Sequence, residues 1–329
     1  MEWKEVRLGD VCNIITGFPF PGKKYSKEGI RVVRGDNVTI GNLRWDTEKD
    51  KRWNEPFDKT EYYSLQANDI VIGMDGSRVG KNKARIKEED LPLLLAQRVA
   101  CVRHNELAEQ DYLYYNIFSK KFIDYVNSIH TGSAIPHISQ KQIEDYKILL
   151  PNLETQRRIA SILSSLDRKI ELNNKINADL EEMAQAIFKN WFVDFEPFKD
   201  GKFVDSELGM IPEGWKVGSP YEYVKVVYGA PYKSAKFNDN GEGLPLIRIR
   251  DLKDCNPQFY TPEILPQTEY VNMGDIVAGM DAEFVPHIWK GNTGLLNQRV
   301  CKLMPQQTSI SNLFVLYLMK PELEFVQSY

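Results

Sequence analysis

The sequence predicts an α+β protein: two strand-rich domains of the same fold, joined by one long helix that can form a coiled coil. The nonapeptide at 68–76 (NDIVIGMDG) recurs almost unchanged at 274–282 (GDIVAGMDA). Between the repeats, residues 153–192 contain neither glycine nor proline. At 329 residues the chain is long enough for two domains with separate hydrophobic cores.

The repeat extends beyond the nonapeptide and keeps its order. The segments at 30–38 (IRVVRGDNV) and 94–102 (LLAQRVACV) match those at 244–252 (LPLIRIRDL) and 295–303 (LLNQRVCKL). Trp3-Lys4 likewise matches Trp215-Lys216, and FIDYVNS before Ile129 is echoed by LEFVQSY at the end of the sequence. Ordered matches of this kind indicate an internal duplication. We therefore predict a first domain at 1–152, a long helix at 153–192, a turn-rich linker at 193–214 and a second domain at 215–329.

Composition limits the class of protein. Hydrophobic content of 42% and charged content of 27% are typical of soluble globular chains. No apolar run approaches the ~20 residues of a membrane span, and the opening MEWKEVRLGD is too polar for a signal peptide, so we expect a cytoplasmic protein. The four cysteines form no C-x-x-C pair, which predicts neither a zinc site nor a disulfide framework. Net charge is −4, so any nucleic-acid contact must come from local basic patches.

One such patch follows the first copy of the repeated strand. The segment 77–87 (SRVGKNKARIK) contains five cations and no acid. Its glycines and Asn82 predict a turn, with the cations alternating along a hairpin arm. A solvated hairpin without a ligand remains an equal alternative. The second copy keeps the strand and replaces the arm with EFVPHIWKGNTG, as loops that contact different targets would do, or as ordinary loop drift would do.

The segment 153–192 is predicted to form one amphipathic helix with an apolar stripe at heptad spacing. Such a helix is about 60 Å long at 1.5 Å per residue, too long to bury its stripe against either domain alone. A polar residue at one a position can fix the register of a coiled coil. We expect the stripe to bind a partner helix, and its members are Ile159, Ile162, Leu166, Ile170, Asn173, Ile176, Leu180, Met183 and Ile187.

Sequence signals for catalysis are weak. NEPF at 54–57 lacks the second proline of the motif used by DNA amino-methyltransferases, and no glycine-rich cofactor loop follows a strand. GSRVGK at 76–81 has the wrong spacing for a phosphate loop. The repeated aspartates are Asp69, Asp75, Asp275 and Asp281, and aspartates that recur close to glycine, as in Asp75-Gly76 and Gly274-Asp275, are more often turn formers than metal ligands. The four histidines form no cluster with metal-ligand spacing, so we predict no metal site and no activity of this chain alone.

The order of domain, helix and domain resembles the DNA-specificity subunit of type I restriction–modification systems. LPNLETQRRIASILSSLDRKIELNNK at the start of the helix and GMIPEGW at the entry to the second copy carry this resemblance most specifically. Gly132-Ser133 and IPHIS at 135–139 continue it at the end of the first copy.

The resemblance implies that each copy is a target recognition domain that reads one half of a two-part sequence in double-stranded DNA. It further implies that paired antiparallel spacer helices set the distance between half-sites and dock two modification (methyltransferase) subunits, which restriction subunits join. S-adenosylmethionine, ATP and magnesium would then belong to those partner subunits, and this chain would need no cofactor.

Base-reading and phosphate-contacting side chains in such domains are expected on loops and hairpins. Arginine can contact guanine, asparagine or glutamine can contact adenine, and lysine can contact phosphate. Gln97-Arg98 and Gln298-Arg299 are identical in the two copies and therefore suit scaffold or phosphate contacts better than discrimination. The candidates are Arg34, Arg78, Lys81, Lys83, Gln97 and Arg98 in the first copy, and Arg248, Arg250, His287, Lys290, Gln298 and Arg299 in the second.

The sequence departs from the family pattern at one place. A typical member has a second long helix after its second recognition domain, whereas this sequence stops at Tyr329, in a region equivalent to that before Ile129. We expect a truncated subunit that self-associates through the helix stripe or takes the distal spacer helix from a separate fragment.

An inactive truncated subunit and a non-catalytic helical scaffold are the alternatives to a DNA-reading subunit. The scaffold predicts no affinity for DNA at all, so a gel shift with random duplex at low salt would distinguish it from the DNA reader.

Overall fold

The structure is a computed structural model that describes residues 3–56, 58–129, 136–281 and 283–327. Gly132, Ser133 and Ile135 of the expected family pattern lie outside these residues. Internal contacts divide the chain into two units, Met1–Asn174 and Lys175–Tyr329, which are described separately below. None of the described helices is both long enough and apolar enough to cross a membrane.

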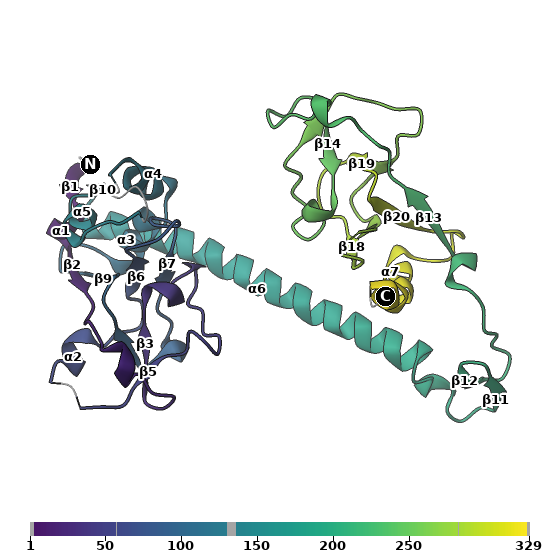
Figure 1. The fold of residues 1–329 in the computed structure, drawn as a ribbon, viewed down its shortest axis with the longest axis horizontal. Coiled ribbons are helices and arrows are strands. Elements are labelled where there is room, and N and C mark those ends of the chain that lie inside the picture. The colour runs from purple at the N-terminus through teal and green to yellow at the C-terminus, as the bar shows by residue number, and fades with distance from the viewer. Residues whose placement is uncertain (1–2, 57, 130–135, 282, 328–329) are drawn as a thin grey trace. The chain divides into compact units, whose positions relative to one another are not determined.

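Copy one (residues 1–152) consists of two sheets that pack face to face, with helices on the outer face of the larger sheet (Figure 1). The larger sheet has the order β2 (Cys12–Thr16), β9 (Val99–His104), β6 (Ile70–Gly73), β7 (Lys83–Arg85) and β4 (Ile40–Gly41). The smaller has the order β5 (Arg52–Trp53), β3 (Ile30–Val33) and β8 (Leu93–Leu95). A third pair joins β1 (Lys4–Arg7) to β10 (Lys147–Leu150). The short helices are α1 (Leu8–Val11), α2 (Thr60–Tyr63), α3 (Gln110–Ile117), α4 (Lys120–Ile129) and α5 (Gln140–Glu144).

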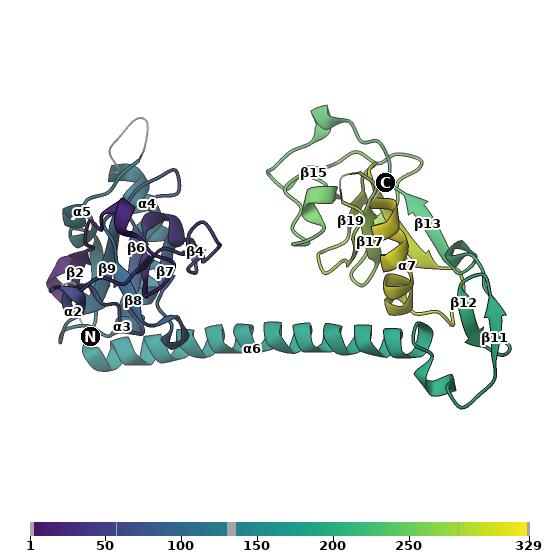
Figure 2. The ribbon, with the colours of Figure 1, turned by 60° about the horizontal axis from the view of Figure 1, so that its bottom comes forward.

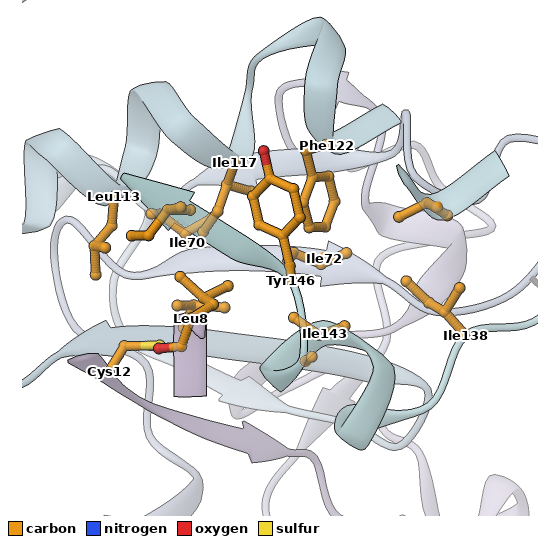
Figure 3. Close-up of a cluster of buried hydrophobic side chains, with 14 of the residues drawn as sticks. Leu8, Cys12, Ile70, Ile72, Leu113, Ile117, Phe122, Ile138, Ile143 and Tyr146 are labelled. Carbon is orange, nitrogen blue, oxygen red and sulfur yellow. The ribbon is translucent and has the colours of Figure 1, made fainter. Parts of the chain in front are cut away.

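The repeated nonapeptide forms the central strand β6, and the alternation of its side chains explains its apolar run. Ile70 and Ile72 point into the core beneath the helices, where Figure 3 shows them with Leu113, Ile117 and Phe122. Val71 points the other way, into the core between the two sheets. Because successive strand side chains face opposite sides, a strand covered on both faces must be apolar throughout.

Copy two (residues 215–329) also contains two sheets, with four strands in each among its described residues (Figure 2). Its first sheet has the order β13 (Val224–Tyr228), β20 (Val300–Pro305), β17 (Ile276–Gly279) and β18 (Pro286–Ile288). Its second has the order β15 (Tyr260–Thr261), β14 (Leu244–Ile247), β19 (Gly294–Leu296) and β16 (Tyr270–Val271). The parallel pair β14–β19 repeats the parallel pair β3–β8. Helix α7 (Asn312–Gln327) covers the sheet face that α3 and α4 cover in copy one.

The 40-residue helix α6 spans Leu153–Phe192, as predicted. Its first turn is fixed to copy one through Gln156, whose side chain is fully buried. The Gln156 Oε1 accepts from the Glu109 amide at 2.9 Å, and its Nε2 donates to the carbonyls of Pro151 and Leu107 at 2.9 and 3.2 Å. Every polar atom of this buried amide is therefore satisfied, and the helix start is tied to α3.

The predicted linker at 193–214 contains more regular structure than its turn residues indicate. Strands β11 (Phe203–Ser206) and β12 (Gly209–Pro212) pair as an antiparallel hairpin. Gly209 adopts a φ of +98° in the turn, a conformation that glycine adopts without strain.

Candidate nucleic-acid interface

The Gln-Arg turn (Gln97-Arg98 in copy one, Gln298-Arg299 in copy two) connects two buried strands in each copy. In copy one, the Gln97 amide donates to the Phe18 carbonyl at 2.8 Å, and the Arg98 carbonyl accepts from the Met74 amide at 3.0 Å. Arg98 has a φ of +66°, which is rare for a side chain of this size. Main-chain bonds to two neighbouring segments therefore hold the turn.

The same main-chain bonds hold the turn of copy two. The Gln298 amide donates to the Ala230 carbonyl and the Arg299 carbonyl accepts from the Met280 amide, both at 2.9 Å. Glycine is required beside each turn, because a Cβ at Gly17 would lie 2.2 Å from the Ala96 carbonyl oxygen and one at Gly229 would lie 2.1 Å from that of Asn297. The glycine, the turn and the end of the repeated strand thus form one frame that both copies share.

An exposed arginine projects from each frame and pairs with the aspartate of the repeated strand. Arg98 lies 2.8 Å from Asp75, and Arg299 lies 2.7 Å from Asp281. The two arginine side chains are 69% and 68% exposed, so both guanidinium groups remain accessible to a larger ligand. Exposed ion pairs contribute little to stability. Each arginine can therefore exchange its aspartate for a phosphate at small cost.

Each Arg–Asp pair borders an open cavity. The cavity of copy one measures about 500 Å³ and is lined by Gln97 and Arg98 together with Arg34 and Asp36. The cavity of copy two measures about 570 Å³, and Gln298 and Arg299 line it. The structure therefore brings Arg34, Gln97 and Arg98 together, as it does Gln298 and Arg299.

Arg34 and its counterpart Arg248 are partly buried in the scaffold. The Arg34 guanidinium lies over the Tyr25 ring at 5.7 Å, and that of Arg248 lies over the Phe259 ring at 4.3 Å. The Arg248 amide donates to the Asp251 carboxylate at 3.0 Å, and burial raises the pKa of that carboxyl above its usual value. These contacts indicate that Arg248 chiefly orders its own loop.

The loops that follow Arg34 and Arg248 differ in charge where the repeats align. Asp36 follows Arg34 by two residues and is exposed, and the exposed residue at the equivalent position after Arg248 is Arg250. Asp36 lines the cavity of copy one, so a frame that both copies share stands beside loops of different charge. This arrangement suits two ligands of one class that differ in detail.

The basic arm of copy one forms a hairpin, since β6 pairs antiparallel with β7. Arg78 and Lys81 are exposed in its turn, and neither side chain has an ion pair with any described residue. This turn begins at Gly76, which also lines the cavity beside Arg98. Arg78 and Lys81 therefore extend the positive surface next to that cavity.

Lys83 does not belong to this surface, and its assignment as a DNA contact is wrong. Its side chain is only 2% exposed, because β7 turns it beneath α3 and α4. The Nζ donates to the Gly80 carbonyl at 2.8 Å and lies 5.4 and 5.0 Å from the rings of Phe118 and Phe122. Burial lowers the pKa of Lys83 to about 8.

His287 and Lys290 lie apart from the cavity of Arg299. They line a different cavity of about 450 Å³, together with Leu180 and Glu181 of α6. Burial lowers the pKa of His287, and its Nε2 lies 3.8 Å from the Glu283 carboxylate. These two candidates face the spacer helix rather than the Gln-Arg turn.

Sequence reasoning missed the aspartates and the glycines of the frame. The sequence pattern indicates turn formers at Asp75 and Asp281, yet each pairs with the arginine of the neighbouring turn, and Asp75 also contacts the His137 ring. The signal was present in the fixed order of Met-Asp and Gln-Arg in both copies.

The helix stripe on α6 is exposed in both units. Among its members, Ile159 is partly buried near the helix start. The remaining apolar members are 44–59% exposed: Ile162, Leu166, Ile170, Ile176, Leu180, Met183 and Ile187. Asn173 is exposed on the same series. Exposed apolar surfaces of this length commonly mark sites of interaction with other proteins.

Comparison with known proteins identifies the family. Residues 1–182 match the family model described as "Type I restriction modification DNA specificity domain", which covers more than half of the chain. The chain belongs to this family. The MjaIX specificity subunit of Methanocaldococcus jannaschii is 36% identical over 144 residues, which cover 43% of this chain and 33% of that protein. The MjaVIII specificity subunit of the same organism is 27% identical over 352 residues, which cover 98% of this chain and 75% of that protein.

A solved structure confirms the fold. The S subunit of the type I restriction–modification system from M. genitalium superposes with a TM-score of 0.54 at 14% identity, covering all of this chain and 80% of that one. The match to the MjaIX subunit thus spans a third of that relative, whereas the other two matches span three quarters or more.

Proposed function

We propose that this chain is the DNA-recognition subunit of a type I restriction–modification complex, with each copy contacting one half of a two-part target. One observation carries the proposal most strongly: two equivalent frames each present an exposed arginine beside an open cavity, while the loops after Arg34 and Arg248 differ in charge. Phosphate contacts position a protein on DNA, and variable contacts around them read sequence. Family membership supports the same function.

Within this proposal the chain itself is not catalytic. It acts on cellular DNA in the cytoplasm, and the helix stripe docks modification subunits, which restriction subunits join. S-adenosylmethionine, ATP and magnesium would act in those partners. The exposed stripe would be covered by a second helix, supplied by another copy of this chain or by a separate fragment. A helix with apolar residues at heptad spacing meets the requirement for such pairing.

The test is selection from a randomised duplex library by the chain together with its cognate modification subunit, followed by methylation mapping. The expected result is two conserved base blocks separated by a fixed gap. Replacing Arg78 and Lys81 by alanine should weaken selection of one block only, because both lie in copy one. Lys147→Ala, which removes an exposed cation on β10 paired with Glu5, is the matched control. Selection of a single uninterrupted block would contradict the assignment of one half-site to each copy.

A further inference from the structure

A short segment that follows α4 in the sequence is bonded to the end of the repeated strand in copy one. The Gly76 amide donates to the Pro136 carbonyl at 3.0 Å, and the Ile138 amide donates to the Met74 carbonyl at 2.9 Å. Ile138 is buried in the core beneath the helices, where Figure 3 shows it. His137 lies between these two bonds, so the main chain fixes its position.

His137 faces Asp75 across this bridge, and Asp75 also holds Arg98. The His137 Nδ1 contacts one carboxylate oxygen of Asp75, and the Arg98 Nη1 donates to the other at 2.8 Å. The Asp75 side chain is 20% exposed, against 46% for His137 and 69% for Arg98. A partly buried carboxylate is therefore shared by two side chains that both remain accessible to solvent.

The two partners of Asp75 differ in how they carry charge. Arginine is always positive in proteins, whereas histidine changes charge between about pH 5 and 8. Because a carboxylate only accepts, the His137 Nδ1 carries the hydrogen of this contact, and Nε2 is the atom that takes up a further proton. With a neutral imidazole, one cation faces the carboxylate. With a protonated imidazole, two cations face it.

Other charged side chains stand on the elements that adjoin this pair. They are Arg34 and Asp36 after β3, Arg78 and Lys81 in the β6–β7 turn, and Lys141 and Glu144 of α5. Arg34 and Asp36 lie 3.7 Å apart, so their charges largely compensate each other. None of these six side chains is a histidine. Among the described groups here, His137 is therefore the one of a type that changes charge between about pH 5 and 8.

We propose that copy one takes up a proton at His137 when Arg98 binds a DNA phosphate; the inference rests on the proposed function and adds a residue to it. A phosphate oxygen replaces Asp75 on the Arg98 guanidinium, so one ion pair breaks and another forms. The Asp75 carboxylate keeps the Nδ1–H of His137. One proton from water binds the His137 Nε2, and the imidazolium then compensates the carboxylate that Arg98 has left.

The direction of the pH effect follows from this exchange. A proton that binds the complex more tightly than the free protein makes the affinity for DNA rise as the pH falls. Affinity should therefore be highest where the imidazole is protonated, and it should decline as the pH rises from about 5.5 to 8. An exposed ion pair of this kind changes an equilibrium by a factor of about two to five, which sets the expected change in affinity.

The experiment measures the affinity of the full chain for a random DNA duplex at low salt between about pH 5.5 and 8. Fluorescence anisotropy should show affinity falling about two- to fivefold over this range. Calorimetry in buffers of different ionisation enthalpy should find an uptake of about 0.2–0.4 proton at its maximum, the amount that such a change in affinity implies. His137→Gln should remove both effects, because glutamine does not titrate.

Two further substitutions separate an effect of charge from an effect on folding. His137→Lys supplies a permanent cation, so at about pH 8 it should bind DNA as tightly as the parent chain does at about pH 5.5. His104→Gln is the matched control, because His104 is exposed at the other end of β9 and its Nδ1 lies 3.0 Å from the Asn105 carbonyl. This control should keep the full pH dependence.

Arg98→Ala tests whether the proton acts through Arg98. With no guanidinium to release, the affinity of this variant should no longer depend on the protonation of His137. The comparison is with the double variant Arg98→Ala, His137→Gln, which should show the same affinity at every pH in the range as Arg98→Ala alone.

Three results would overturn the proposal while DNA binding itself stands. One is a parent chain whose affinity is the same throughout the pH range. Another is pH dependence that survives in full in His137→Gln, because the proton would then bind elsewhere. The third is a difference between Arg98→Ala and the double variant that grows as the pH falls, because the imidazolium would then contact DNA directly. A parent chain that binds no DNA at any pH would instead refute the proposed function, and this inference with it.

Discussion

Replacing Lys83 by methionine should stabilise copy one and leave DNA binding unchanged. Burial beneath α3 and α4 lowers the pKa of Lys83 from 10.5 to about 8. A lowered pKa means that the folded protein binds this proton less tightly than the unfolded chain does. The resulting penalty is present in full below pH 8, and it is relieved as the pH rises from about 8 to 10.5.

The size of the effect follows from the pKa difference. At 1.36 kcal/mol for each pKa unit, the fall to about 8 corresponds to a penalty of about 3 kcal/mol. Methionine has a similar length and no charge, but it leaves the Gly80 carbonyl without its donor, which costs about 1 kcal/mol. The Lys83→Met variant should therefore gain about 2 kcal/mol in the free energy of unfolding at pH 7. Because the burial penalty falls by about 1.36 kcal/mol per pH unit above pH 8, the gain should vanish at about pH 9.5, and near pH 10.5 the variant should be less stable by about 1 kcal/mol.

The assay is urea unfolding of the parent chain and the variant between pH 7 and 10.5. Hydrogen exchange of peptides from β6 and β7 reports the unit that contains Lys83 separately from the other unit. Taking the difference between the two proteins at each pH removes the titration of other groups. DNA affinity is measured in parallel over a range of salt concentrations. A variant that is less stable at pH 7, or a DNA salt slope that falls, would refute the placement of Lys83 in the core.

Three further predictions concern the frames and the helix. Arg98→Ala and Arg299→Ala should each lower the slope of log affinity against log salt by about 0.9 in fluorescence anisotropy, and an unchanged slope would mean that the arginine contacts no phosphate. Gln156→Ala should destabilise copy one by about 3 kcal/mol, because it leaves one buried amide and two buried carbonyls without a hydrogen-bond partner. Hydrogen exchange at 153–160 should accelerate in this variant, and unchanged exchange would contradict the anchoring role of Gln156. The double variant Leu166→Glu, Ile170→Glu should abolish self-association through α6, measured by sedimentation velocity, without altering the circular dichroism spectrum. Persistent association would place the contact elsewhere.

The internal repeat and the long segment without glycine or proline allowed most of the fold to be predicted. The internal repeat identified equivalent strands, and β6 and β17 occupy the same central place in their sheets. The absence of glycine and proline predicted α6 with both ends at the observed residues. Both features can be recognised in a single sequence, because they depend only on local periodicity and on the similarity of one part of the chain to another.

Side-chain burial at the candidate site could not be predicted in the same way. Alternation along the basic arm places Lys83 on one face of β7, but the sequence does not reveal that α3 and α4 cover that face. His287 and Lys290 likewise follow a repeated strand, yet they turn toward α6 because copy two has a different loop there. Elements distant in sequence decide which face of a strand is exposed to solvent, so this exposure depends on the tertiary structure.

The main-chain frame around each Gln-Arg turn separates the parts of the protein that must stay constant from those that can change. Its bonds run between backbone atoms, and its closest contact excludes all residues but glycine at Gly17 and Gly229. Substitutions in the rim therefore alter charge and shape without altering the geometry of the turn. Such a frame can acquire a new specificity by exchange of a few surface residues, or of a whole loop by recombination, while folding proceeds as before.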